Sequence, residues 1–99
     1  MKKSPSVLIV DSDRAWADGV ADLFVAYGYE AEVVADGGSA VERAGQADFD
    51  IAFVDVRDAD SLFELHKLKP HARVVMTGAA LLQKPLTFER MLEVVETAV

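Results

Sequence analysis

The positions of apolar and polar residues along the chain follow two kinds of pattern. Short, continuous apolar runs predict strands that are buried on both faces of a parallel sheet. Between them, apolar residues recur every three or four positions, which predicts helices with one face against the core. The predicted strands lie within 7–13, 31–35, 51–57 and 74–78, and the predicted helices within 14–27, 39–47, 62–68 and 87–95. This alternation predicts an α/β fold with right-handed crossovers and helices on both faces of the sheet.

Three of the predicted strands end in polar side chains. The first ends at Asp11 and Asp13, the third at Asp55 and the fourth at Thr77. Because the carboxyl ends of parallel strands share one edge of the sheet, where ligands of open α/β folds bind, we expect one site there. A carboxylate at the end of a buried strand is costly without a metal or a donor, which favours a functional role for Asp55. Asp13 equally suits the N-cap of the following helix, and Thr77 suits a strand for its β-branched side chain alone.

Composition limits the class of protein. The 99 residues suffice for one small domain over 1–99, and an apolar share of 52% with a charged share of 27% is typical of a folded protein. No apolar run approaches the roughly 18 residues of a membrane span. The chain has no cysteine, which fits a reducing compartment, and we expect a cytoplasmic protein. The net charge of −7 disfavours nucleic acid as a partner, because its phosphates would be repelled.

Four motifs, each at the end of its own apolar run, resemble the receiver domain of two-component response regulators. They are the acidic step at Asp11, the single Asp55, the pair Thr77 and Gly78, and the pair Lys84 and Pro85. The resemblance covers almost the whole chain. It implies a doubly wound parallel sheet of the flavodoxin-like type, and a signalling module rather than an enzyme.

The same resemblance implies roles for these residues. A histidine kinase or a phosphotransfer protein would phosphorylate Asp55 with the help of Mg²⁺, and the signal would pass to a downstream protein partner. The implied site residues are Asp55 as the phosphoacceptor, Thr77 and Lys84 as contacts of the phosphoryl group, and Asp11, Asp55, the backbone carbonyl of Arg57 and, as a further candidate, Asp13 as Mg²⁺ ligands. The chemistry suits these roles, because a carboxylate is a competent nucleophile for phosphoryl transfer and Mg²⁺ prefers oxygen ligands.

Two positions depart from the family pattern. Ser12 stands where a second adjacent acid is usual, so one metal carboxylate is missing unless Asp13 takes its place. Leu81 stands where an aromatic residue usually precedes the lysine by three positions, so the usual coupling of a threonine shift to an aromatic rotamer has no aromatic to move. Both departures favour an alternative function, that of a pseudo-receiver which binds a partner protein without cycling phosphate.

The segment after Thr77 is short. Six residues, 78–83, separate it from Lys84, whereas a parallel crossover needs a dozen or more and normally contains a helix. We therefore expect the helix between the fourth and fifth strands to be missing or rearranged. Four solutions stay open: an antiparallel edge, an irregular connection beside a four-stranded sheet, a domain swap that makes a homodimer instead of a monomer, or a segment omitted from the sequence.

One enzyme class also stays open. Asp11, Ser12 and Asp13 match the D-x-D pattern of haloacid-dehalogenase-type phosphatases, which use the first aspartate as nucleophile and the second as general acid. That resemblance is short, and the chain has no room for a cap domain. We therefore expect a receiver domain, either as a single-domain regulator or as part of a larger protein such as a hybrid kinase.

Overall fold

The computed structural model describes residues 5–77 and 88–98. Its elements, in chain order, are β1 (Ser6–Val10), α1 (Arg14–Ala26), β2 (Glu30–Val34), α2 (Gly37–Ala44), β3 (Ile51–Asp55), the 3₁₀ helix η1 (Val56–Ser61), α3 (Leu62–Leu68), β4 (Arg73–Thr77) and α4 (Phe88–Ala98). The four strands and four helices predicted by residue range are present, and the fifth strand implied by the resemblance lies outside the described residues. The residues after β3, for which the apolar pattern predicts no helix, form the short helix η1, which the Asp55 carboxylate caps by accepting a hydrogen bond from the backbone N–H of Arg57.

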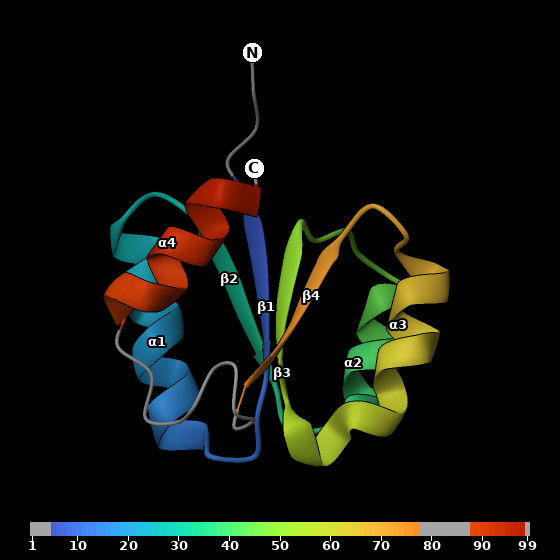
Figure 1. Cartoon of the computed structure of the whole chain (residues 1–99). Helices are drawn as coiled ribbons and strands as arrows, with labels where there is room; N and C mark the ends of the chain where they lie inside the picture. The colour runs from blue at the N-terminus through green and yellow to red at the C-terminus, as the bar shows by residue number, and fades with distance from the viewer. Residues whose placement is uncertain (1–4, 78–87, 99) are drawn as a thin grey trace.

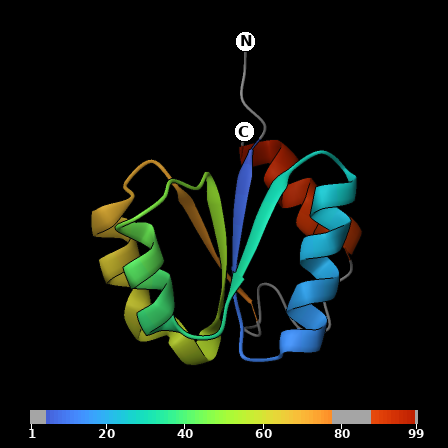
Figure 2. The same cartoon turned by 180° about the vertical axis from the view of Figure 1, so that it is seen from behind.

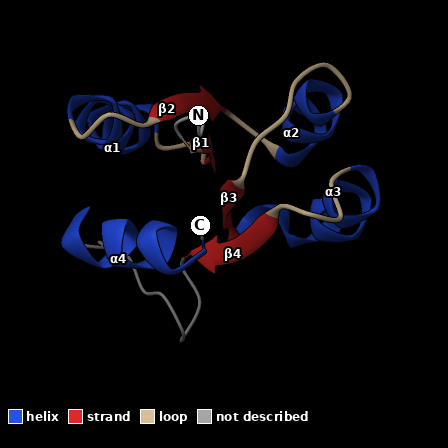
Figure 3. Ribbon diagram, turned by 90° about the horizontal axis from the view of Figure 1, so that it is seen from above, coloured by secondary structure: helices blue, strands red, loops and turns tan. Residues whose placement is uncertain are grey.

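The strands form one parallel sheet in the order β2-β1-β3-β4. Helices α1 and α4 cover one face of this sheet and α2 and α3 cover the other (Figure 1). Figure 2 shows the same layers from behind, and Figure 3 shows them from above, with the sheet between the two helix pairs. The doubly wound parallel sheet is therefore confirmed. The chain adds β2 on one side of β1 and β3 on the other, so the strand order reverses between β1 and β3. The crevice at such a reversal is where open α/β folds bind ligands.

Alternate residues of the central strands face opposite helix layers. In β1, Val7 and Ile9 pack into the core under α1 and α4, whereas Leu8 and Val10 pack into the core under α2 and α3. This period of two is the geometry of a strand buried on both faces. It explains why the sequence shows continuous apolar runs rather than an alternation of apolar and polar residues.

The two cores differ in the size of their side chains. The core under α1 and α4 holds the larger ones, including Phe24, Phe53, Ile9, Ile51 and Met91. The rings of Phe24 and Phe53 stack with their centroids 6.2 Å apart. Alanines make up much of the core under α2 and α3, at Ala40, Ala44 and Ala52. Small side chains let α2 and α3 lie close to the sheet.

Local signals fix where the helices begin and end. Asp13 caps α1 by accepting a hydrogen bond from the backbone N–H of Trp16, and Asp36 caps α2 by accepting one from Ser39. Helix α2 begins at Gly37, earlier than the predicted 39, because of this cap. Beyond α1, Gly28 has a φ of 91°, which glycine adopts without steric cost.

Residues 78–87 connect β4 to α4 and lie outside the described residues. They include Lys84 and Leu81, and the four solutions for the segment 78–83 also fall there. Ten residues separate the two elements, which is fewer than a parallel crossover with its helix requires. Among the described helices, none is long and apolar enough to cross a membrane.

Candidate functional site

Two carboxylates and a hydroxyl lie at the carboxyl ends of adjacent strands. Asp11 directly follows β1, Asp55 ends β3, and Thr77 ends β4. All three residues are only 1% exposed. Asp55 and Thr77 are direct partners in the parallel register of β3 and β4. The structure thus brings these side chains to one edge of the sheet, and we call this the carboxyl edge.

The side chain of Arg57 joins the two carboxylates. Its Nε lies 3.2 Å from Asp55 Oδ1 and its Nη2 lies 3.1 Å from Asp55 Oδ2, so the guanidinium donates to both oxygens. The same Nη2 lies 4.0 Å from Asp11 Oδ1. The hydrogen bond with Asp55, followed by the charge of that carboxylate, raises the pKa of the Arg57 guanidinium above its ordinary value. Among the described residues, Arg57 therefore places a cation of the chain itself at this edge.

The backbone also holds both carboxylates in place. The backbone N–H of Arg57 donates to Asp55 Oδ1 at 2.8 Å, and the backbone N–H of Asp13 donates to Asp11 Oδ1 at 2.8 Å. Asp13 itself is exposed, and its carboxylate accepts from the Trp16 backbone N–H at 3.2 Å. Asp13 is thus the N-cap of α1, which is one of the two roles that the sequence offered for it.

Helix α2 supports the segment that follows Asp55. Asp58 Oδ1 accepts a hydrogen bond from the backbone N–H of Gly37 at 3.1 Å, which ties η1 to the first turn of α2. A Cβ at Gly37 would overlap Ser61 Oγ and lie 2.7 Å from Ser61 Cβ. Only glycine leaves room for this approach. The segment that carries Asp55 and Arg57 is therefore fixed by its contacts with the first turn of α2.

Comparisons with known proteins identify the fold that carries these residues. Neither a protein-family model nor a curated protein matches the sequence. Among solved structures, a CheY-like response regulator receiver domain protein from Methanospirillum hungatei JF-1 is 25% identical, with a TM-score of 0.89 over 96% of this chain and 93% of that chain. The receiver domain of the hybrid histidine kinase CckA is also 25% identical, with a TM-score of 0.85 over 94% of this chain and 97% of that chain. The chain has the receiver fold.

A third structure shares this receiver fold. It is a response regulator protein from Burkholderia pseudomallei with a phosphorylated aspartic acid, a calcium ion and citrate. It is 23% identical, with a TM-score of 0.82, and the match covers 95% of this chain and 68% of that chain. The resemblance to receiver domains that the motifs indicate is thereby confirmed.

The donor set at the carboxyl edge fits a magnesium ion that keeps part of its water shell. Within 5–77 and 88–98, no three histidine or acidic side chains gather as a metal-binding group. Mg²⁺ in phosphoryl-transfer sites is usually held by one or two carboxylates, with water and phosphate oxygens completing its octahedron. Asp11 and Asp55 match that requirement. The backbone carbonyl of Arg57 and the carboxylate of Asp13 stay predicted ligands.

Sequence reasoning missed two parts of the candidate site at the carboxyl edge. The resemblance gave Arg57 a role only through its backbone carbonyl, whereas its guanidinium holds Asp55. An arginine two residues past a strand-ending aspartate was the available signal, because a long side chain can fold back over the strand end. Asp58 lies between the predicted elements, and no local pattern indicates that its side chain accepts a hydrogen bond from Gly37, which is 21 residues away in sequence.

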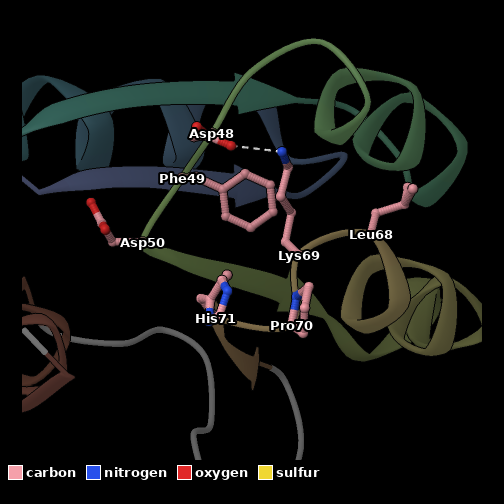
Figure 4. A pocket seen from close by; sticks show the side chains of 8 residues that line it. Asp48, Phe49, Asp50, Leu68, Lys69, Pro70 and His71 are labelled. Carbon is pink, nitrogen blue, oxygen red and sulfur yellow. Dashed lines mark hydrogen bonds and ion pairs between the residues drawn. The ribbon is translucent and has the colours of Figure 1, made fainter.

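A pocket lies at the opposite end of the sheet, where β3 and β4 begin, and we call this end the amino edge (Figure 4). It is open, with a volume of about 330 Å³. Its lining residues are Asp48, Phe49, Asp50, Leu68, Lys69, Pro70, His71 and Ala72. Lys69 Nζ lies 2.7 Å from Asp48 Oδ1, and Figure 4 shows the ring of Phe49 beside this pair. The pocket is therefore separate from the two buried carboxylates of the carboxyl edge.

Proposed function

We propose that this chain is a phosphoacceptor receiver domain, in which a histidine kinase or a phosphotransfer protein phosphorylates Asp55 with the help of Mg²⁺. The observation that carries the proposal is the pair of buried carboxylates, Asp11 and Asp55, at the ends of adjacent strands. Two like charges buried side by side are unfavourable unless a cation accompanies them. One or two carboxylates are the usual protein ligands of Mg²⁺ at a site that handles a phosphoryl group, and this pair supplies them.

The proposed step is a transfer to a carboxylate oxygen. An oxygen of Asp55 attacks the phosphorus of the donor, and the new P–O bond forms as the P–N bond to the donor histidine breaks. The bonding electron pair leaves with the imidazole, and the product on Asp55 is an acyl phosphate. Bound Mg²⁺ would neutralise charge on the phosphoryl oxygens. We assign Thr77 as a hydroxyl donor and Lys84 as a cation for the product, which adds roughly two negative charges.

The comparisons support this proposal at the level of the fold. The Burkholderia pseudomallei response regulator carries a phosphorylated aspartic acid and a calcium ion. In the present chain, Asp55 ends β3 beside the crevice at which the strand order reverses. Phosphorylation there would place new negative charge beside Arg57, whose guanidinium already lies 3.1 Å from Asp55 Oδ2.

Labelling with acetyl phosphate and Mg²⁺ tests the proposal. Reduction of the acyl phosphate with borohydride, followed by peptide mass spectrometry, locates the modified aspartate. We expect the label on Asp55, and we expect omission of Mg²⁺ to suppress it. A label on Asp11 would instead indicate the haloacid-dehalogenase-type phosphatase, and the absence of any label would indicate the pseudo-receiver.

One observation favours the pseudo-receiver as a second candidate. The fork of Arg57 donates to both oxygens of Asp55, as in a permanent structural ion pair. Ser12, in place of a second adjacent acid, points in the same direction. In that case the receiver fold would bind its protein partner in a single charge state, and Mg²⁺ would have no effect on binding of that partner.

A further inference from the structure

The side chain of Arg57 supplies positive charge at the carboxyl edge. Arg57 lies in η1, two residues after Asp55, and its guanidinium lies within 4.0 Å of oxygens on both buried aspartates. Burial makes each carboxylate dependent on a nearby cation, because the charged form loses its hydration. In the unliganded protein, the guanidinium therefore compensates the charge of the buried carboxylates, as a metal ion would in the metal-bound protein.

The guanidinium and a divalent cation compete for the same oxygens. Nε and Nη2 each donate to a different oxygen of Asp55, so neither oxygen is without an Arg57 donor. A metal ion bound to Asp55 and Asp11 would lie beside the guanidinium, and two cations at that separation repel strongly in a partly buried site. The guanidinium and a metal ion therefore cannot both bind Asp11 and Asp55 without weakening each other's binding.

The side chain of Arg57 can rotate away from the two carboxylates. Its side chain is 66% exposed, so rotation toward solvent is not blocked by a surrounding core. The backbone of the segment need not move, because Asp58 stays bonded to Gly37.

We propose that Arg57 is an internal counter-ion that occupies the Asp11–Asp55 pair in the unliganded protein and must be displaced before a divalent cation binds. This inference rests on the proposed function, because it concerns the regulation of the same site. The apparent Mg²⁺ affinity then equals the intrinsic affinity reduced by the fraction of molecules in which Arg57 has left. Arg57 thereby sets the Mg²⁺ concentration at which the site becomes competent.

Replacement of Arg57 tests the competition directly. Mg²⁺ titration followed by amide chemical shifts of residues 11–13 and 55–58 gives the dissociation constant for each variant. We expect Arg57→Ala to bind Mg²⁺ on the order of 5- to 10-fold more tightly than the natural chain, from population-shift arithmetic. Arg57→Lys, which keeps the charge but loses the fork, should fall between them.

The matched control is Arg14→Ala. Arg14 is exposed and pairs with Asp18 on α1, and its loss changes the net charge by the same amount without removing a donor from Asp55. We expect Arg14→Ala to leave the Mg²⁺ dissociation constant within about twofold of the natural value, as for screened surface charges. Equal tightening in Arg14→Ala and Arg57→Ala would overturn the inference, as would unchanged or weaker binding in Arg57→Ala.

A second measurement separates competition from unfolding. Without Mg²⁺, Arg57→Ala should melt at a lower temperature than the natural chain, and saturating Mg²⁺ should raise its melting temperature by more than it raises that of the natural chain. If Arg57→Ala does not fold, Arg57→Gln serves instead, because it keeps amide donors without the charge.

The result is distinguishable from failure of the proposed function. If Asp55 is labelled by acetyl phosphate but Arg57→Ala binds Mg²⁺ no more tightly, the counter-ion proposal is wrong and the proposed function stands. If Arg57→Ala binds Mg²⁺ tightly and no aspartate is labelled, the counter-ion proposal stands and the proposed function is wrong.

Discussion

The two ends of the sheet carry similar ion pairs in opposite surroundings. At the carboxyl edge, Arg57 Nη2 lies 3.1 Å from Asp55 Oδ2, and the side chain of the acid is 2% exposed while that of the base is 66% exposed. At the amino edge, Lys69 Nζ lies 2.7 Å from Asp48 Oδ1, and the acid is 91% exposed while the base is 21% exposed. The shorter pair is the one whose acid is hydrated.

Distance alone therefore does not rank these pairs. Asp48 keeps most of its hydration whether or not Lys69 is present, so the amino-edge pair contributes little to stability. Asp55 has lost its hydration and lies beside a second buried acid, so its charge depends on the cations that accompany it. Chemistry that exchanges one cation for another, or adds a phosphoryl group, belongs at the edge where the charges are buried.

The largest difference between the two edges is expected in phosphoryl labelling. Asp55→Asn should reduce labelling by acetyl phosphate to background, because an amide is not a competent nucleophile for phosphoryl transfer. Asp48→Asn should be labelled as the natural chain is, and its free energy of unfolding should change by about 1 kcal/mol or less, as for exposed ion pairs. Mass spectrometry and urea unfolding measure the two quantities. Labelling that persists in Asp55→Asn would place the phosphoacceptor elsewhere.

The edges also differ in how closely their backbones approach. At the carboxyl edge, a Cβ on Gly37 would overlap Ser61, whereas a Cβ on Gly45, which ends α2 at the amino edge, would meet Glu42 O at an ordinary 3.5 Å. Gly37→Ala should lower the free energy of unfolding by about 1–3 kcal/mol, the usual effect of overpacking. Gly45→Ala should change it by less than about 0.5 kcal/mol. Equal effects in urea unfolding would contradict the closer packing at the carboxyl edge.

The fold was predictable because its signals are local. Continuous apolar runs that end in Asp11, Asp55 and Thr77 define the strands and the edge at which those residues meet, since a strand buried on both faces has few polar positions before its end. The cap at Asp13 was also open to prediction, because an aspartate before a helical run is a favourable N-cap.

The rest depends on contacts that no local pattern encodes. The helix η1 has no apolar periodicity, and the Asp55 carboxylate that caps it was expected to serve only chemistry. The guanidinium of Arg57 holds Asp55 through the conformation of a long side chain, which sequence spacing leaves free. Gly37 is required because Ser61, from a different element, approaches its Cα closely. The sequence around Gly37 does not indicate this contact.

The smallest expected effect concerns Asp36, an exposed acid at the carboxyl edge. Asp36 caps α2, and the hydrogen bond from the backbone N–H of Ser39 lowers its pKa below 3.8. Since the folded pKa lies below the unfolded one, the unfolded chain takes up the proton first as the pH falls. The contribution of Asp36 to stability is therefore fully present above about pH 5 and is lost as the pH falls through the folded pKa.

Asp36→Asn keeps a favourable N-cap but cannot titrate, so its melting temperature should fall less than that of the natural chain between about pH 5 and pH 2. Thermal unfolding across this range measures the difference, which should be slight because Asp36 is hydrated in both states. A carbon-detected NMR titration of the Asp36 carboxyl group supplies a direct check, since a midpoint at or above 3.8 would contradict the cap as the cause. A difference in melting temperature with the opposite sign would mean that the charge of Asp36 destabilises α2, against the expected attraction between a carboxylate and a helix N-terminus.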